Sequence, residues 1–81
     1  MSTPRAQIAA NVRAETARSM KTQSQVARHL GIDKSSMAKR YNGQREFTGT
    51  ELVTIAAFLD IDVMNLLALA AEPATPNAVS A

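Results

Sequence analysis

Residues 22–43 read TQSQVARHLGIDKSSMAKRYNG, and the spacing within this stretch decides the fold that we predict. Thr22 followed by Gln25 is a capping box, because the threonine hydroxyl accepts from the Gln25 N–H while the Gln25 side chain accepts from the Thr22 N–H. Gly31 ends the helix that starts there, since glycine adopts the left-handed conformation at little cost. The stretch therefore begins with a short helix that stops at a sharp corner.

A second helix follows that corner directly. Asp33 is a favourable N-cap for a helix over residues 34 to about 42, with Ser36 as its capping partner, and Asn42-Gly43 supplies the stop. Two helices that cross at about 90 to 120° through a short turn need small and apolar residues at their contact. The residues that meet this need are Val26, Ala27, Leu30, Ile32 and Met37.

Helices are also predicted on either side of this pair. Thr3 and Pro4 are typical of a helix start, and Ile8 and Val12 lie four residues apart on one face, with Ala9, Ala17 and Met20 near the same side. After the pair, Thr48 and Glu51 form a second capping box. The apolar stripe that follows it consists of Leu52, Ile55, Ala56 and Leu59.

Asp62 is expected to cap a fifth helix over residues 63 to about 71. The last stretch, EPATPNAVSA, mixes prolines with small and polar residues and is typical of a disordered tail. The sequence therefore predicts an all-α protein of five short helices, with one domain over residues 1–71 and a tail over residues 72–81.

Charge is distributed unevenly along the chain. All nine Lys and Arg residues lie at or before Arg45, against two acidic residues, which gives this part a net charge of +7. From Glu46 onward there are five acidic residues and no basic ones, a net charge of −5. The asymmetry indicates an acidic partner for the first part, with nucleic acid the leading candidate. The alternative is a dipolar surface that only keeps the protein soluble.

The stretch at residues 22–43 resembles the helix-turn-helix of lambda repressor-like (Cro/cI, XRE-type) DNA-binding domains. Their typical run reads roughly T-Q-x-x-L-A-x-x-L-G-V-S-x-S-x-I-S-x-x-x-x-G. The resemblance includes the preceding helix with Ile8 and Val12 and the following ELVTIAAFLDIDVMNLL, and covers about residues 6–69. It implies a compact five-helix domain that binds operator sites in double-stranded DNA and regulates transcription. Within the family, a small phage or prophage repressor of the Cro type is the expected function.

The chain departs from the pattern of this family at three positions. The family usually has an aliphatic residue where this chain has Arg40. It often has a glutamate where this chain has Tyr41, and that glutamate pairs with an arginine on the first helix, where this chain has Thr16. We interpret Tyr41, four residues after Met37, as taking the core-facing position, with its hydroxyl within reach of Thr16. Arg40 is then displaced to the flank of the helix, where we expect it to meet a phosphate.

The predicted third helix presents its polar residues opposite Met37 and Tyr41. In the resembling fold this helix lies in the major groove with its N-terminal residues against base edges. Lysine suits guanine O6 and N7, serine donates or accepts, and a small apolar side chain contacts the thymine methyl. The expected base-reading residues are Lys34, Ser35, Ala38 and Lys39, and the alternative for the lysines is ordinary solvated charge.

Phosphate contacts are expected beside the groove. In the resembling family, the glutamine that opens the second helix and the turn after the third helix hold the DNA backbone. A helix N-terminus suits this role, because its unpaired N–H groups and its dipole attract an anion. The expected phosphate-binding residues are Gln23, Arg40, Asn42, Gly43, Gln44 and Arg45, and more weakly Arg13, for which an exposed charge without a specific role is the alternative.

The predicted fifth helix has more apolar residues than one core-facing stripe requires. These residues are Val63, Met64, Leu66, Leu67, Leu69 and Ala70. Such an excess indicates a partner. In the resembling family the partner is commonly a second copy, giving a two-fold homodimer, at least on DNA, that binds half-sites ~34 Å apart. The alternative is that these residues complete the core of a monomer.

Several classes of function are disfavoured. The chain has no cysteine and one histidine, which excludes disulfides, thiolate metal sites and zinc fingers. His29 and Asp33 lie four residues apart near serines, as in a hydrolase, but Gly31 breaks the helix between them and nothing indicates an oxyanion hole. We therefore expect no enzyme activity, no cofactor, no metal and no small-molecule substrate.

The apolar stretches at residues 52–59 and 63–71 fall short of the ~20 residues that span a membrane. The N-terminal residues also contain no apolar run typical of a signal peptide. We expect a soluble protein in the cytoplasm of a bacterial host, associated with its nucleoid and not with a membrane. Two other functions fit these residues: an antitoxin that represses its own operon, and a helical protein-interaction module that does not bind DNA.

Overall fold

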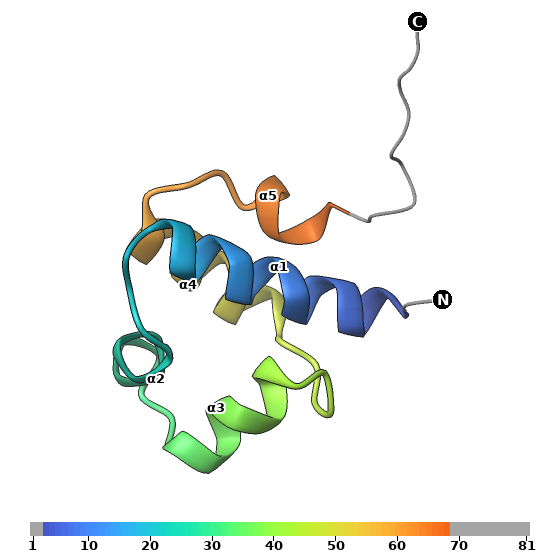
Figure 1. Cartoon of the computed structure of the whole chain (residues 1–81), viewed down its shortest axis with the longest axis vertical. Helices are drawn as coiled ribbons and strands as arrows, with labels where there is room; N and C mark the ends of the chain where they lie inside the picture. Colours follow the sequence, from blue (N-terminus) through green and yellow to red (C-terminus); the bar gives the residue numbers. More distant parts are fainter. Residues whose placement is uncertain (1–2, 69–81) are drawn as a thin grey trace, which may run out of the picture.

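The structure is a computed structural model that describes residues 3–68, and within this range it contains five α-helices and no strand (Figure 1). The helices are α1 (Pro4–Arg18), α2 (Gln23–Leu30), α3 (Lys34–Tyr41), α4 (Gly49–Leu59) and α5 (Met64–Leu67). The all-α fold and the order of its helices are confirmed. The predicted tail at residues 72–81 lies outside the described residues.

Each of the first four helices begins directly after the predicted capping residue. The side chains of the four caps accept a backbone N–H bond, and the caps are Thr3, Thr22, Asp33 and Thr48. At Thr22 and Thr48 the reciprocal bond from the cap's own N–H to Gln25 or Glu51 is also present. Because such a cap stabilises a helix by about 1 kcal/mol, these helix starts are fixed by local sequence.

Helices α1, α2 and α4 end in the left-handed conformation. Gly31 has φ 73° after α2, as predicted, but Met20 (φ 63°) and Asp60 (φ 59°) adopt the same conformation without being glycine. Met20 is 88% exposed, and Ala17 is exposed too, so the prediction that both face the core is wrong. The reason is that Thr16 takes the last inward position of α1, and the chain turns away immediately afterwards.

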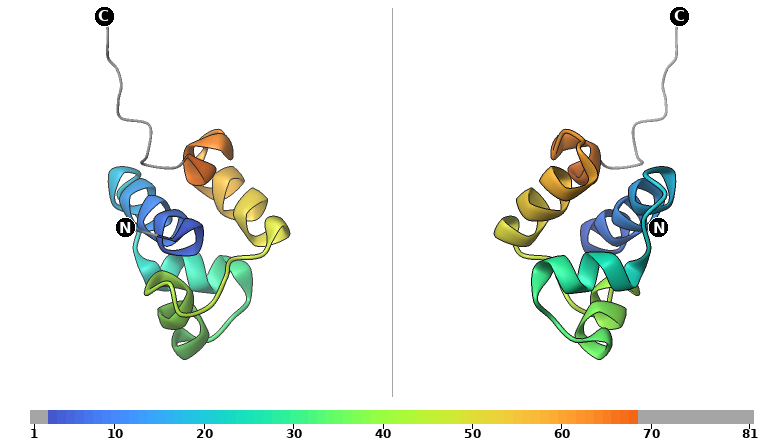
Figure 2. Two further views of the ribbon diagram at one scale, coloured as in Figure 1. Left: turned by 90° about the vertical axis from the view of Figure 1, so that its right-hand side faces the viewer. Right: turned by 90° about the vertical axis from the view of Figure 1, so that its left-hand side faces the viewer.

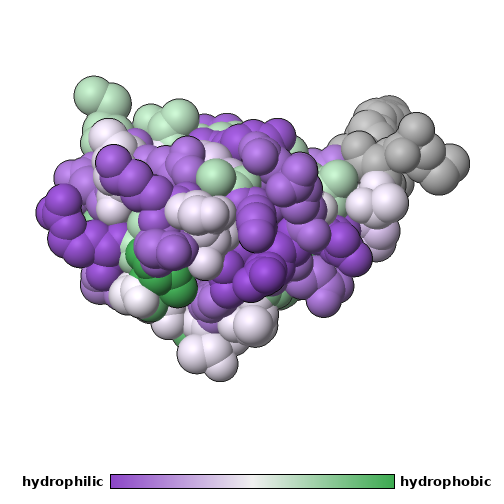
Figure 3. All heavy atoms as spheres, turned by 90° about the horizontal axis from the view of Figure 1, so that it is seen from below, coloured by the Kyte–Doolittle hydropathy of each residue, from purple (hydrophilic) through white to green (hydrophobic). Residues whose placement is uncertain are grey.

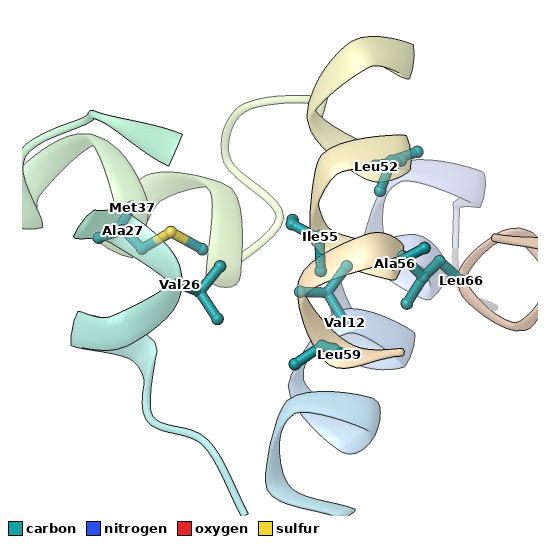
Figure 4. Close-up of a cluster of buried hydrophobic side chains, with 9 residues drawn as sticks. All are labelled: Val12, Val26, Ala27, Met37, Leu52, Ile55, Ala56, Leu59 and Leu66. Carbon is teal, nitrogen blue, oxygen red and sulfur yellow. The ribbon is translucent and has the colours of Figure 1, made fainter. Parts of the chain in front are cut away.

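One apolar core joins all five helices (Figure 4). Helices α1 and α4 lie between α5 on one side and α2 and α3 on the other (Figure 1, Figure 2). The nine buried residues of the core cluster are Val12, Val26, Ala27, Met37, Leu52, Ile55, Ala56, Leu59 and Leu66. All four positions of the stripe predicted for α4 are among them. This arrangement leaves α3 at one edge of the domain, with an outer face that the other residues of the range 3–68 do not cover.

Helix α5 is shorter than predicted. Asp62 does accept a bond from the Met64 N–H at 2.9 Å, but Ala68 has extended backbone (ψ 134°), so the helix ends at Leu67 and not near residue 71. The amide of Asn11 on α1 donates to the carbonyls of Leu66 at 3.0 Å and Ala68 at 2.6 Å. A side chain from a distant helix thus binds a carbonyl that a longer helix would use for its own hydrogen bond.

Candidate nucleic-acid interface

Helices α2 and α3 form a helix-turn-helix unit at one edge of the domain. In Figure 1, α2 is seen nearly along its axis while α3 runs across the view, so the two helices cross steeply. Gly31 turns the chain, and the Ile32 N–H donates to the Ala27 carbonyl at 3.1 Å, which closes the end of α2. The Asp33 carboxylate then starts α3 by accepting from the Ser36 N–H at 2.8 Å.

The rotation of α3 about its own axis is fixed by its inner residues. Met37 is fully buried and Tyr41 packs half-buried against the same core. On the opposite face Lys34, Ser35 and Lys39 are exposed, and the half-buried Ala38 lies at the margin of this face, towards α2. The four residues predicted to read bases therefore lie along one accessible side of the helix.

A shallow hollow separates the N-terminal halves of α2 and α3. Its lining residues are Gln23, Ser24, Ala27, Lys34, Met37 and Ala38. The hollow brings Gln23, predicted to hold a phosphate, next to two of the predicted base-reading residues. It also includes Ser24, which was not predicted because the sequence pattern at this helix start is explained by the Thr22 capping box alone. Seen from the side where α3 lies, the surface of the molecule is mostly hydrophilic (Figure 3).

Asp33 lies next to the exposed lysines of α3. Hydrogen bonds from Ser36, with a smaller contribution from the charge of Lys39, hold the pKa of this carboxyl below its ordinary value of 3.8. Asp33 is therefore ionised at neutral pH. A negative charge at a helix N-terminus is favourable to the helix dipole. Lys34 and Lys39 outweigh that charge, so the accessible side of α3 remains positive at neutral pH.

Arg40 has a partner within the protein. Its Nε donates to Glu51 Oε1 at 3.1 Å, and its Nη1 donates to the Ser36 carbonyl at 3.1 Å. The side chains of Arg40 and Glu51 are only 12% and 17% exposed. The structure thus directs Arg40 towards α4, whereas the sequence placed it on an open flank where a phosphate was expected. The sequence did not show this pair because its members lie eleven positions apart.

Two arginines of α1 contact the end of α3 and the loop after it. Arg13 donates to the Tyr41 carbonyl, and Arg5 Nη1 donates to the Gln44 carbonyl at 3.5 Å. A cation near the last carbonyls of a helix is favourable to its dipole. Arg13 therefore has a specific intramolecular role, and Arg5 contacts the loop that carries predicted phosphate-binding residues.

That loop has a defined backbone. Asn42, Gln44 and Arg45 are exposed, while Gly43 is half-buried with φ 81°. A Cβ atom at Gly43 would lie 3.5 Å from the Cα of Ala6, so the loop passes close to the start of α1. The loop and the first turn of α1 thus form one continuous surface beside the end of α3.

The predicted contact between Tyr41 and Thr16 is not present. Thr16 is 2% exposed, and its hydroxyl oxygen has no hydrogen-bond partner among the described residues. The prediction was right that Tyr41 faces inward and wrong about the hydroxyl bond. The residue that links α1 to this end of α3 is instead Arg13, whose longer side chain reaches the backbone carbonyl of Tyr41.

His29 and Asp33 each contact other groups of the protein. The His29 ring stacks on Phe58, with ring centroids 4.4 Å apart, while Asp33 caps α3. Within residues 3–68 no group of three or more His, Cys, Asp or Glu residues could hold a metal ion. In the same part of the chain, every helix is too short or too polar to cross a bilayer.

Of the six residues predicted to bind a second copy, the four that the structure describes divide into two groups. Leu66 is fully buried in the core of the chain itself, which corrects its assignment to an interface, and Val63 is half-buried against the same core. Met64 is 62% and Leu67 38% exposed, so these two apolar side chains remain available on α5. Leu69 and Ala70 lie outside the described residues.

A comparison with known families supports the helix-turn-helix assignment. Residues 16–72 match a family model described as a Cro/C1-type HTH DNA-binding domain. This range contains α2, α3, α4 and α5 completely, together with the end of α1. No curated protein and no solved structure matches the chain.

Proposed function

The chain belongs to the Cro/C1-type helix-turn-helix family of DNA-binding domains, and we propose that within this family it is a Cro-type phage or prophage repressor. It is a DNA-binding transcriptional regulator whose partner is double-stranded DNA. A small DNA-binding domain represses most simply by occupying an operator and so excluding other proteins from it.

The observation that supports sequence-specific binding is the accessible side of α3. Its buried Met37 fixes the helix so that Lys34, Ser35 and Lys39 point away from the core. We propose that these three residues and Ala38 enter the major groove and contact base edges. An exposed lysine can donate to guanine O6 and N7. A serine hydroxyl can donate to or accept from several base edges, and an alanine methyl can contact the thymine methyl.

We propose that phosphates are held on both sides of α3. At α2 the Thr22 cap uses the Gln25 N–H, which leaves the N–H groups of Gln23 and Ser24 for an anion. Beyond α3 the loop of Asn42, Gly43, Gln44 and Arg45 provides the second contact, with Arg5 beside it. Arg13 and Arg40 are left out of this set because both already bind groups within the protein.

We further propose that two copies bind one operator through α5. Met64 and Leu67 are the exposed apolar residues of this helix, and Leu69 and Ala70 follow them along the chain. A two-fold dimer would read half-sites about one DNA turn, ~34 Å, apart. Such an operator is palindromic, so selection of bound sequences from a random DNA pool tests the dimer as well as the base preference.

The test of this function is a binding titration with the selected DNA at several salt concentrations. We expect affinity to fall steeply as salt rises. Lys39→Ala should lose about 1 to 3 kcal/mol of binding free energy and relax the preference at one position of each half-site. Lys21→Ala is the control, because the Lys21 ammonium lies 5.2 Å from the centre of the Phe58 ring and outside α3. It removes the same charge and should leave base preference unchanged.

Two outcomes would contradict the proposal at different levels. If Lys39→Ala leaves affinity and base preference untouched, the docking of α3 is wrong although DNA binding stands. If the wild-type protein binds no DNA at low or moderate salt, the repressor function is wrong and a helical protein-interaction module remains.

A further inference from the structure

We propose that the ion pair between Arg40 and Glu51 sets the orientation of α3 in the DNA groove and thereby contributes to base preference. Both are positioning residues, since neither is expected to touch DNA. The inference rests on the proposed function, because it concerns how the helix that reads the bases is held.

The Glu51 carboxylate is the point at which two helices are joined. Its Oε1 accepts from Arg40 Nε at 3.1 Å and from the Thr48 backbone N–H at 3.0 Å. The Thr48 hydroxyl in turn accepts from the Glu51 N–H at 3.1 Å. The glutamate that completes the capping box of α4 therefore also binds the last turn of α3.

The guanidinium of Arg40 is fixed at both ends. While Nε binds Glu51, Nη1 donates to the Ser36 carbonyl one turn earlier in α3, at 3.1 Å. This second bond ties the side chain to the backbone of its own helix. The ion pair therefore links α4 to the backbone of α3 and not only to a flexible side chain.

The surroundings of the pair expose it less to salt than an ordinary surface pair. The Arg40 and Glu51 side chains are 12% and 17% exposed, so salt screens them less than fully exposed charges. Burial raises the pKa of the Glu51 carboxyl, but the hydrogen bond from Arg40, the bond from Thr48 and the Arg40 charge outweigh it and hold the pKa below its ordinary value of 4.5. The carboxylate is thus charged at neutral pH.

The position of the pair explains why it would affect base reading. Helix α3 packs against α1 and α2. Arg13 of α1 donates to the carbonyl of Tyr41, in the last turn of α3. The Arg40–Glu51 pair adds a contact with α4 at the same end. Held by both α1 and α4, the helix resists rotation about its axis. Even a small rotation would move Lys34 and Lys39 relative to the base edges, because both project from the outer face.

The test compares base preferences of four proteins, each by selection from a random DNA pool and by titration against the preferred wild-type sequence. The variants are Arg40→Met, Glu51→Gln and the double substitution. Arg40→Met keeps an unbranched side chain, and Glu51→Gln keeps an oxygen for the Thr48 N–H, so the capping box is retained. We expect each single variant to lose roughly tenfold in affinity and to change base preference.

The double variant should lose no more than either single variant, because each substitution alone already breaks the same pair. The slope of affinity with salt should stay at its wild-type value. Arg45→Met is the matched control: it removes the same charge from the exposed loop, and should lower affinity for all sequences and reduce the salt slope by about 1.

Arg40→Lys separates positioning from simple charge. A lysine keeps the positive charge for a phosphate but lacks the planar fork that binds Glu51 and the Ser36 carbonyl together. We expect it to change base preference as Arg40→Met does. A urea unfolding curve for each variant verifies that the protein assayed is folded. If Glu51→Gln does not fold, the base preference of Arg40→Lys tests the inference instead.

Three results would overturn the inference. The first is base preference that stays unchanged in folded variants, and the second is additive losses in the double variant. The third is a reduced salt slope in Arg40→Met with normal binding by Arg40→Lys, which would make Arg40 a phosphate contact. In all three the wild-type protein still binds DNA, whereas failure of the wild-type titration itself removes the proposed function.

Discussion

Helices α3 and α5 were each predicted to contact a partner, DNA for α3 and a second copy for α5, and the protein holds the two helices very differently. Helix α3 has eight residues, a side-chain cap at its start, and contacts from Arg13 and Glu51 at its end. Helix α5 has four residues, and Asn11 binds the carbonyls where it ends. The difference indicates that contacts at both ends orient α3, while α5 depends on the core for its position.

The exposed faces of the two helices differ in the same way. The outer face of α3 carries Lys34, Ser35 and Lys39, whose polar groups match hydrated base edges and phosphates. Helix α5 exposes Met64 and Leu67, which match another apolar surface. One helix is thus suited to nucleic acid and the other to a second protein surface, and each is anchored by one fully buried side chain, Met37 or Leu66.

The largest effect is expected when the anchor of α5 is removed. Leu66→Ala deletes a fully buried side chain and should reduce the free energy of unfolding by about 2 to 5 kcal/mol. For a domain of this size that is a large part of its stability. The measurement is urea unfolding of the variant against wild type.

The control for Leu66→Ala is Leu67→Ala, which removes the same atoms from a side chain that is 38% exposed. Its cost should be clearly smaller. If the two variants lost equal free energies of unfolding, Leu66 would not anchor α5 in the core.

A smaller effect is expected on association. Met64→Ser removes an exposed apolar side chain from α5. It should weaken the proposed dimerisation on the operator by roughly 1 to 2 kcal/mol, the size expected if a second copy were to bury part of this side chain. Titration against DNA with two half-sites and with one half-site measures this. Only the two-site affinity should change.

Met20→Ser is the matched control for this substitution. Met20 is 88% exposed and lies at the end of α1, in a turn that we assign to no partner. It should leave both titrations unchanged. A loss of one-site affinity in Met64→Ser would place α5 against DNA instead of a second copy.

The boundaries of the helices could be predicted because they depend on residues close together in the chain. Each cap at Thr22, Asp33 and Thr48 acts on an N–H group three residues away, and Gly31 acts on its own backbone. The outward face of α3 was also predictable, since it follows from helical spacing once Met37 is assigned to the core.

The contacts that hold α3 and α5 could not be predicted in this way. Arg40 and Glu51 are eleven positions apart, and Asn11 is 55 positions from Leu66. Such pairs depend on how helices pack, and several polar residues could equally have been partners. Resemblance to the family did not help, because the family usually has an aliphatic residue at Arg40. The arginine at position 40 indicated that α3 is held differently in this chain, but it did not identify Glu51 as its partner.

The smallest expected effect is the dependence of the α3 contact on pH. The pKa of Glu51 in the folded protein lies below its ordinary value of 4.5, so the unfolded state binds a proton more readily. The stability that this carboxylate contributes is then fully present above about pH 4.5 and is lost as pH falls through the lower folded value. For a partly exposed pair we expect on the order of 0.5 to 1 kcal/mol.

The measurement is the difference in unfolding free energy between wild type and Glu51→Gln, taken at about pH 7 and about pH 3. Glu51→Gln cannot titrate at this position, so the difference should shrink as the solution becomes acidic. Asp33, whose pKa is also lowered, titrates in both proteins and cancels. A difference that stays constant with pH would mean that folding does not lower the pKa of Glu51, and the charge of Arg40 would then contribute nothing to holding the end of α3 against α4.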